Sequence, residues 1–422
     1  MIHVRGGQVL TDTGVRRLDV SIDGQEIVEL ATELTGVPGQ VIDATNCLVG
    51  PAFVDVHVHF REPGQTWKED LQSGAAAAAA GGYSAVVTMP NTEPPLDNQS
   101  AIAELMESAA GVDQVEIRVA AAMTKGRQGR SLVDFQSLYR SGVRIFSDDG
   151  DSVLDEEVMG QGLALVSRLP GAVISQHAEN HAMTRGGHMH LGDESRRLGI
   201  PGLPSEAEIE IVERDIDLVR QTGGRYHCQH VSTSEVVDLL REAKAERLPI
   251  TSEVTPHHLS FTDADVERIG TNLKMYPPVR EPGDRLALRE GLLDGTIDMV
   301  ATDHAPHVPE EKDVPFKDAP RGVIGLETAA SVVSSVIGDP DRFFRVMSTA
   351  PAWLAGLSDH GRPLTQGGPP NIVVFDPSRD RVPTAFESKS SNSPYRGMVL
   401  KGVVKATIHK GIITYSEVPD GR

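Results

Sequence analysis

The 422-residue sequence has only two cysteines, Cys47 and Cys228, and they lie far apart. Two isolated thiols exclude a disulfide framework and a zinc site built from cysteine, so both are expected to be small buried hydrophobic residues. No apolar run approaches the roughly 20 residues that a membrane-spanning helix needs. Met1 is followed by a polar, strand-like stretch and not by a charged segment and an apolar block. We therefore expect a cytoplasmic protein without a secretory signal or a membrane contact.

Positive charge is also scarce, since 40 lysines and arginines face 60 aspartates and glutamates, which gives a formal net charge of -20. Binding to nucleic acid through its phosphates needs clustered lysine and arginine, so nucleic acid is excluded as a partner. The same excess of negative charge would repel an anionic metabolite. An acidic substrate must therefore meet a local concentration of positive charge, and bound metal ions are its simplest source.

Short apolar, β-branched runs alternate with longer segments of helical character between Phe53 and Asp303, which is typical of βα units around a parallel sheet. A run of alanine that is stopped by Gly81 and Gly82 predicts one of the helices. Eight runs predict an α/β fold, a (β/α)8 barrel whose active site lies where the strands end. The runs cover residues 53–60, 84–89, 116–121, 143–147, 172–177, 226–231, 250–254 and 297–302.

The two ends of the chain differ from this pattern, because residues 2–30 and 372–415 hold short alternating runs broken by glycine, aspartate and proline. Neither end is long enough to form a domain alone. We expect residues 1–51 and 366–422 to pair into one small β-sandwich domain beside a barrel domain of residues 52–365. This division agrees with a length that exceeds what one hydrophobic core usually serves.

The clearest chemical signal is the pair His57 and His59 in the first apolar run. Alternate side chains of a strand share one face, so both imidazoles are expected on the same side. A lone pair of this kind also arises by chance on protein surfaces, and the number of further ligands decides between the two readings. Other predicted strand ends supply such ligands, namely Asp148-Asp149, His177, His230 and Asp303.

The carboxyl ends of parallel barrel strands converge in space, so four histidines and two carboxylates can surround one point. Imidazole and carboxylate ligands suit zinc, and six of them exceed the three or four protein ligands of a single zinc site. We therefore expect two Zn²⁺ ions per subunit that share a bridging carboxylate and a hydroxide. His227 is three residues before His230, so its side chain is expected to face the other way and to pack against an outer helix.

Several segments resemble the amidohydrolase superfamily, and specifically the bacterial class I dihydroorotases, over essentially the whole chain. These segments are His57-Val58-His59-Phe60-Arg61-Glu62-Pro63-Gly64, Met89-Pro90-Asn91-Thr92, Asp148-Asp149-Gly150, His230-Val231-Ser232-Thr233 and Thr302-Asp303-His304-Ala305-Pro306-His307. The resemblance implies that one zinc is bound by His57, His59 and Asp303, that Asp149 bridges, and that His177 and His230 hold the second zinc.

The resemblance also implies the residues that contact the substrate. Arg61 and Asn91 would recognise a carboxylate with help from His307, while backbone groups around Arg321 and Gly322 would cover a pyrimidine ring. The family usually places an asparagine where Tyr276 stands, and a phenol does not reproduce the paired donor and acceptor of an amide. Many relatives also carry an aromatic residue at the position of Arg321.

The implied reaction is the reversible cyclisation of N-carbamoyl-L-aspartate to (S)-dihydroorotate in pyrimidine biosynthesis. In the direction of hydrolysis, a hydroxide held by the zinc ions would attack the ring carbonyl, and Asp303 would pass its proton to the leaving ring nitrogen. We expect a homodimer that acts on this small molecule, and a complex with aspartate carbamoyltransferase stays open.

Two alternatives stay open as well. A hydantoinase, dihydropyrimidinase or allantoinase would use the same metals, but Arg61 and Asn91 argue against it because a neutral ring offers no carboxylate. A catalytically silent scaffold for aspartate carbamoyltransferase would typically lack metal ligands, whereas this chain keeps all six.

Overall fold

The computed structural model describes residues 1–35 and 38–417. Each of the eight predicted apolar runs contains a strand, and all of these strands pair in parallel. One sheet has the order β6-β7-β8 and the other has the order β15-β14-β13-β10-β9. Parallel bridges also join Ala121 to Phe146 and Val58 to His304, so the edges of the two sheets meet. The strands are β6 (Phe53–Val58), β7 (Tyr83–Thr88), β8 (Glu116–Val119), β9 (Ile145–Phe146), β10 (Val173–Gln176), β13 (Tyr226–Cys228), β14 (Ile250–Val254) and β15 (Met299–Val300).

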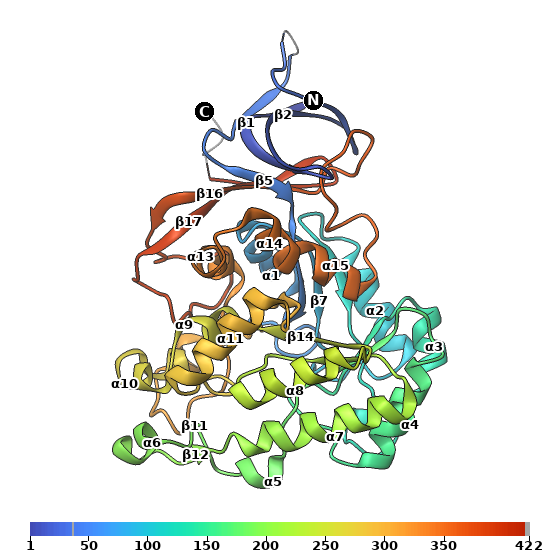
Figure 1. The fold of residues 1–422 in the computed structure, drawn as a ribbon, viewed down its shortest axis with the longest axis vertical. Helices are drawn as coiled ribbons and strands as arrows, with labels where there is room; N and C mark the ends of the chain where they lie inside the picture. The colour runs from blue at the N-terminus through green and yellow to red at the C-terminus, as the bar shows by residue number, and fades with distance from the viewer. Residues whose placement is uncertain (36–37, 418–422) are drawn as a thin grey trace.

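A helix follows each of these strands along the chain, which makes the fold α/β (Figure 1). The helices are α1 (Leu71–Ala80), α2 (Gln99–Ala109), α3 (Phe135–Arg140), α4 (Glu156–Val166), α7 (Glu206–Thr222), α8 (Ser234–Ala245), α11 (Pro282–Asp294) and α13 (Leu326–Val336). We call the segment from β6 to the end of α15 (Ala350–Ala355) the α/β part.

Helix α1 shows how the sequence sets its own ends. The Asp70 carboxylate caps the first turn by accepting a hydrogen bond from the Ser73 amide at 2.8 Å. The alanines that follow favour a helix and are small enough to lie buried against the sheet. Gly82, with φ of 92°, then turns the chain in a left-handed conformation, so the predicted end of the helix is confirmed.

Shorter elements are inserted between the regular units and supply side chains to the site described below. Those after β10 are α5 (His181–Thr184), β11 (Met189–His190), α6 (Asp193–Leu198) and β12 (Gly202–Leu203). Those after β14 are α9 (Pro256–Ser260) and α10 (Val266–Ile269). Helix α12 (Pro309–Lys312) follows β15, and α14 (Pro340–Phe344) follows α13.

Both ends of the chain enter one further sheet, which we call the terminal sheet. Its order is β18-β17-β16-β5-β1-β2-β3, with β4 paired to β1. Strand β16 pairs antiparallel with β5, which confirms that the two ends of the chain come together. Hydrogen bonds join all of these strands into one sheet, and residues from both chain ends share one buried cluster. The strands are β1 (Ile2–Thr11), β2 (Gly14–Asp23), β3 (Glu26–Ala31), β4 (Gln40–Asp43), β5 (Leu48–Pro51), β16 (Ile372–Arg381), β17 (Leu400–His409) and β18 (Ile412–Ser416).

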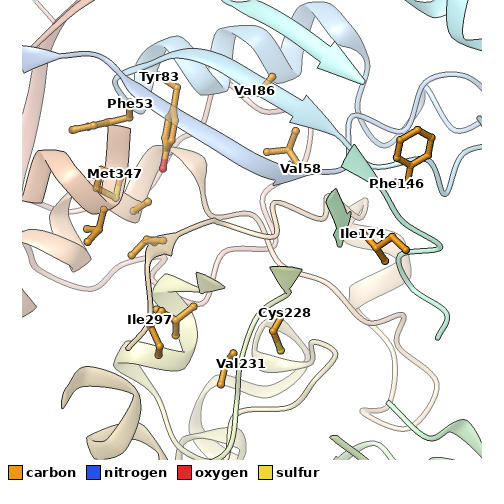
Figure 2. Packing of buried hydrophobic residues seen from close by; sticks show 14 of the residues in the cluster. Phe53, Val58, Tyr83, Val86, Phe146, Ile174, Cys228, Val231, Ile297 and Met347 are labelled. Carbon is orange, nitrogen blue, oxygen red and sulfur yellow. The ribbon is translucent and has the colours of Figure 1, made fainter. Parts of the chain in front are cut away.

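The core of the α/β part lies between the strands and their covering helices (Figure 2). Phe53 and Tyr83 meet edge to face there, with ring centroids 5.6 Å apart. Cys228 is fully buried in the same cluster, and Cys47 is buried in the cluster of the terminal sheet, so the hydrophobic role predicted for both thiols is confirmed. Within the described ranges, no helix has the length and apolarity needed to cross a bilayer.

Candidate metal centre

The six predicted ligands lie together at the carboxyl ends of β6, β9, β10, β13 and β15, and all are buried. On one side, His59 Nε2 is 2.9 Å from Asp303 Oδ1 and 3.6 Å from Asp149 Oδ2. His57 Nε2 lies between the two carboxylates, 3.2 Å from Asp149 Oδ1 and 3.5 Å from Asp303 Oδ1. Ligand atoms of His57, His59 and Asp303 lie within 4.8 Å of one another, which is a suitable spacing for one metal ion.

A second group shares Asp149 with the first. Ligand atoms of His57, Asp149 and His230 also lie within 4.8 Å of one another. His177 Nδ1 is 2.8 Å from His230 Nε2 and 4.0 Å from Asp149 Oδ1. The Asp149 carboxylate therefore faces both pairs of histidines, as a bridging ligand would.

The structure separates the two neighbouring aspartates after β9. Asp148 Oδ1 accepts hydrogen bonds from the amides of Met123 and Thr124 at 2.9 and 3.0 Å, and its other oxygen accepts from the Thr124 hydroxyl. Asp148 therefore supports the loop after β8, while Asp149 points to the histidines.

Charges in this centre favour neutral ligand histidines and an ionised bridge. Burial together with the charge of His230 lowers the pKa of His177 to about 3, and burial together with His57 lowers the pKa of His230 to about 3. Burial alone would raise the pKa of Asp149, but His57, His59 and His177 outweigh it and hold that pKa well below its ordinary value. Neutral imidazoles and an ionised carboxylate are the forms that bind metals.

These residues fit a pair of divalent ions. The buried Nε2 of His57 has no hydrogen-bond partner among the described residues, although such atoms are costly to leave unsatisfied. A metal bond would satisfy it. The set of imidazole nitrogens and carboxylate oxygens is also the one that zinc and its neighbours in the first transition series prefer.

Glu253 on β14 is a functional candidate that the sequence analysis missed. Its Oε1 is 2.6 Å from His57 Nδ1, and its Oε2 is 3.0 Å from His227 Nε2. A carboxylate that accepts the Nδ1 proton of a histidine leaves Nε2 as the metal-binding atom. The printed contacts of His227 are with Glu253 and Thr251 on the neighbouring strand, so the prediction that it only packs against an outer helix was wrong. An acid inside an apolar strand was the available signal for Glu253.

Arg61 and His307 lie beside the metal centre, as predicted for substrate-binding residues. Arg61 Nη2 is 3.4 Å from His307 Nε2, and Arg61 Nε donates to the Pro306 carbonyl oxygen at 3.3 Å. His307 Nδ1 is also 2.9 Å from Glu311 Oε2 and 3.3 Å from Lys68 Nζ. Lys68 and Glu311 form an ion pair at 3.1 Å and thereby hold His307 beside Arg61. Polar loops carry both residues, and nothing in the sequence distinguished them.

Asn91 lies between two of the predicted ligands. Its Oδ1 is 2.9 Å from His59 Nδ1, and its Nδ2 donates to Asp149 Oδ2 at 3.1 Å. The amide thus orients the ligand side chains in addition to lining the cavity.

Tyr276, Arg321 and Gly322 complete the wall of a cavity of about 240 Å³ over the metal centre. The guanidinium carbon of Arg321 lies 3.8 Å from the centroid of the Tyr276 ring. Gly322 has φ of 133°, and a side chain there would meet Ala305 Cβ at 2.8 Å, so only glycine fits. The cavity is lined by His59, Arg61, Asn91, Asp149, Gly150, His177, His230, Tyr276, Asp303, Ala305, Arg321 and Gly322.

Backbone strain is concentrated at this site. Arg61, His230 and Asp303 all have positive φ, at 59°, 28° and 47°. Such conformations cost on the order of 1–3 kcal/mol each and persist where surrounding contacts fix them, commonly at functional sites. The strain agrees with a site in which position matters more than stability.

Known proteins with similar sequences point in one direction. The family model described as Dihydro-orotase-like matches residues 46–236. A dihydroorotase of Deinococcus radiodurans is 40% identical over 89% of this chain and 91% of its own length. A dihydroorotase of Mycobacterium leprae is 41% identical over 94% of this chain and 95% of its own length.

Solved structures give the same fold at lower identity. The L-hydantoinase (dihydropyrimidinase) of Arthrobacter aurescens superposes with a TM-score of 0.87 at 24% identity, covering 99% of this chain and 96% of its own. The dihydropyrimidinase of Brevibacillus agri has a TM-score of 0.84 at 23% identity, covering 98% and 95%. These structures share the fold, whereas the sequence relatives at about 40% identity identify the family. The chain belongs to the dihydroorotase family.

Proposed function

We propose that this protein is a dihydroorotase that interconverts N-carbamoyl-L-aspartate and (S)-dihydroorotate. One observation carries the proposal: six metal-competent side chains converge beside an arginine, Arg61, that has no carboxylate within 4 Å among the described residues. The metal centre suits the opening and closing of a cyclic amide, and the free guanidinium suits a substrate that carries a carboxylate.

The scaffold that we propose is a (β/α)8 barrel of residues 52–365 beside a β-sandwich of residues 1–51 and 366–422. The two bridges between the parallel sheets support the barrel. The pairing of β5 with β16 and their shared buried cluster support the second domain. In a barrel of this kind the active site lies at the carboxyl ends of the strands, where the six side chains are.

The metals that fit are two zinc ions. His57, His59 and Asp303 would hold one, His177 and His230 would hold the other, and Asp149 would lie between them. When bound, such ions supply Lewis acidity and lower the pKa of a coordinated water towards about 7.

The chain itself supplies binding and proton transfer. Asp303 borders the cavity, and its Oδ1 is held by His59 at 2.9 Å, which places a carboxylate where it can accept a proton and return it to the ring nitrogen. Arg61 binds the substrate carboxylate with His307 beside it. Asn91 orients His59 and Asp149 and adds an amide to the same wall.

Hydantoinases and dihydropyrimidinases share the fold, so substrate comparison is the decisive experiment. The purified protein should hydrolyse dihydroorotate, measured by ultraviolet absorbance, and should act poorly on hydantoin, dihydrouracil and allantoin. A chelator should remove the activity and added Zn²⁺ should restore it. Preferential turnover of a neutral ring, or full activity of metal-free protein, would contradict the proposal.

The control variant Arg61→Met separates the two substrate classes. Loss of its charge should raise the KM for dihydroorotate by about tenfold or more, because a hydrogen-bonded ion pair is lost. Any slow turnover of a neutral ring should be unaffected.

A further inference from the structure

The cavity contains a second guanidinium, that of Arg321, in addition to Arg61. Neither arginine has a carboxylate oxygen within 4 Å among residues 1–35 and 38–417, although the chain carries a net charge of -20. Charged groups taken out of water are normally paired, because an unpaired one is costly. Two unpaired cations in one cavity therefore indicate an anionic ligand.

The side chain of Arg321 is fixed in place by groups that do not use its charge. Its guanidinium stacks on Tyr276 at 3.8 Å from the ring centroid, and its Nη2 donates to the Gly187 carbonyl oxygen at 2.8 Å. Tyr276 is fixed in turn, since its hydroxyl is 3.0 Å from Thr184 Oγ1 and 3.4 Å from His181 Nδ1. A guanidinium has several more N–H donors in a planar fork, so donors remain for a ligand.

We propose that the Arg321 side chain is a second anion-binding group of the cavity, which Tyr276 holds in place, and that the site therefore favours a dicarboxylate. This inference rests on the proposed function, because it distinguishes the two partners of that reaction. N-carbamoyl-L-aspartate carries two carboxylates, and the dihydroorotate ring carries one. Arg61 serves the carboxylate common to both, and Arg321 serves the one that exists only in the open chain.

The burial of the site makes this charge matter. Arg321 is partly buried, and burial lowers its pKa, yet arginine keeps its proton in proteins. Stacking on an aromatic face leaves the edge of the guanidinium free to bind a carboxylate. Tyr276 thus acts as a positioning residue for Arg321 and does not itself need to reproduce an amide.

The test compares Arg321→Met with the native protein in both directions of the reaction. The KM for N-carbamoyl-L-aspartate should rise about tenfold, while the KM for dihydroorotate should change less than about twofold. Because the equilibrium constant is unchanged, the ratio of the two kcat values must shift by the compensating factor, which checks the measurement internally. An equal change of both KM values, or no change in either, would overturn the proposal.

Three variants sharpen the result. Arg321→Lys keeps the charge without the fork, so its KM for the dicarboxylate should lie between those of the native protein and Arg321→Met. Tyr276→Leu removes the ring under the guanidinium and should raise the same KM in the same direction. Arg185→Met is the matched control, since Arg185 is exposed on the segment that carries Gly187, and it should leave both KM values unchanged. An effect of Arg185→Met equal to that of Arg321→Met would show a general charge effect and contradict the assignment.

Failure of the proposed function is distinguishable from failure of this inference. Absence of dihydroorotate turnover by the native, zinc-loaded protein would contradict the function alone. Calorimetric titration with N-carbamoyl-L-aspartate would then decide the second point, since the native protein should bind it about tenfold more tightly than Arg321→Met does. Equal binding by the two proteins would overturn the role of Arg321.

Discussion

Asp303 and Glu253 are both acids buried beside histidines of the metal centre, yet their surroundings assign them different work. Asp303 borders the cavity and contacts His59 and His57 through the same oxygen. Glu253 does not line the cavity and contacts the far side of the His57 ring. At the scale of single residues, the expected consequences of changing them therefore differ.

Replacement of Asp303 by asparagine should abolish most turnover. The amide retains the size and one oxygen for metal, but it does not accept the proton that the reaction must move, so kcat should fall by about 10²- to 10⁴-fold. Metal content, measured by mass spectrometry, should remain above half of the native value. Near-native kcat in this variant would contradict the role of Asp303.

Replacement of Glu253 by glutamine should act on metal binding before it acts on chemistry. An amide holds the His57 ring less strongly than a carboxylate does, and loss of such supporting groups typically costs about 10- to 100-fold in metal affinity. Competition with a chelator measures this directly. Glu246→Gln, which changes an exposed acid paired with Arg220, is the control and should bind metal normally. Equal affinities in the two variants would remove Glu253 from the centre.

At the scale of elements, the segment from α12 to Gly322 is fixed by two buried lysines. Lys312 Nζ donates to the carbonyl oxygens of Pro320 and Gly322, both at 2.9 Å. Lys274 Nζ donates to those of Phe316 and Ala319, both at 2.6 Å. An irregular segment has few backbone hydrogen bonds of its own, so these ammonium groups satisfy its carbonyls and set the position of the cavity wall.

Lys312→Met should therefore loosen this segment without unfolding the protein. The expected result is a KM several-fold higher for both substrates, together with faster cleavage by trypsin after the exposed Lys317. Lys317→Met, which alters an exposed side chain of the same segment, should leave KM unchanged. Unaltered KM and unaltered proteolysis in Lys312→Met would show that the segment is held by other means.

At the scale of the whole molecule, histidines join the terminal sheet to the α/β part. His360 Nδ1 is 2.9 Å from the Ser84 hydroxyl on β7, and its ring stacks on that of His409 on β17 with centroids 5.8 Å apart. His409 Nδ1 is 3.2 Å from Asn371 Oδ1. Burial, then the charges of Lys410 and His360, lower the pKa of His409 to about 4 against the opposing effect of Glu116.

This joint predicts a loss of stability in acid. The unfolded chain binds a proton at His409 below pH 6.5, whereas the folded chain resists it down to about pH 4, so the contribution is complete above pH 6.5 and is lost as the pH falls. The loss amounts to at most about 3 kcal/mol near pH 4. Urea unfolding of the native protein and of His409→Gln at pH 8 and pH 5 measures it, and the variant should lose less stability between the two pH values. Parallel losses would assign the acid sensitivity to other groups.

The sequence by itself determined the elements and the identity of the metal ligands. Every predicted apolar run of the α/β part contains a strand, because β-branched periodicity and glycine or proline stops are local properties of the chain. The two histidines at alternate positions, and the acids and histidines at other strand ends, identified the centre because parallel strands bring their carboxyl ends together.

Only the tertiary structure decided which acid faces the histidines, what supports them and how the cavity wall is built. Asp148 and Asp149 are adjacent in the sequence, and the contacts of Asp148 with Thr124 separated their roles. The pairing of Glu253 with His57, and the stacking of Arg321 on Tyr276, join residues from distant parts of the chain. Local patterns carry no information about such contacts, because packing of the complete fold determines which side chains meet.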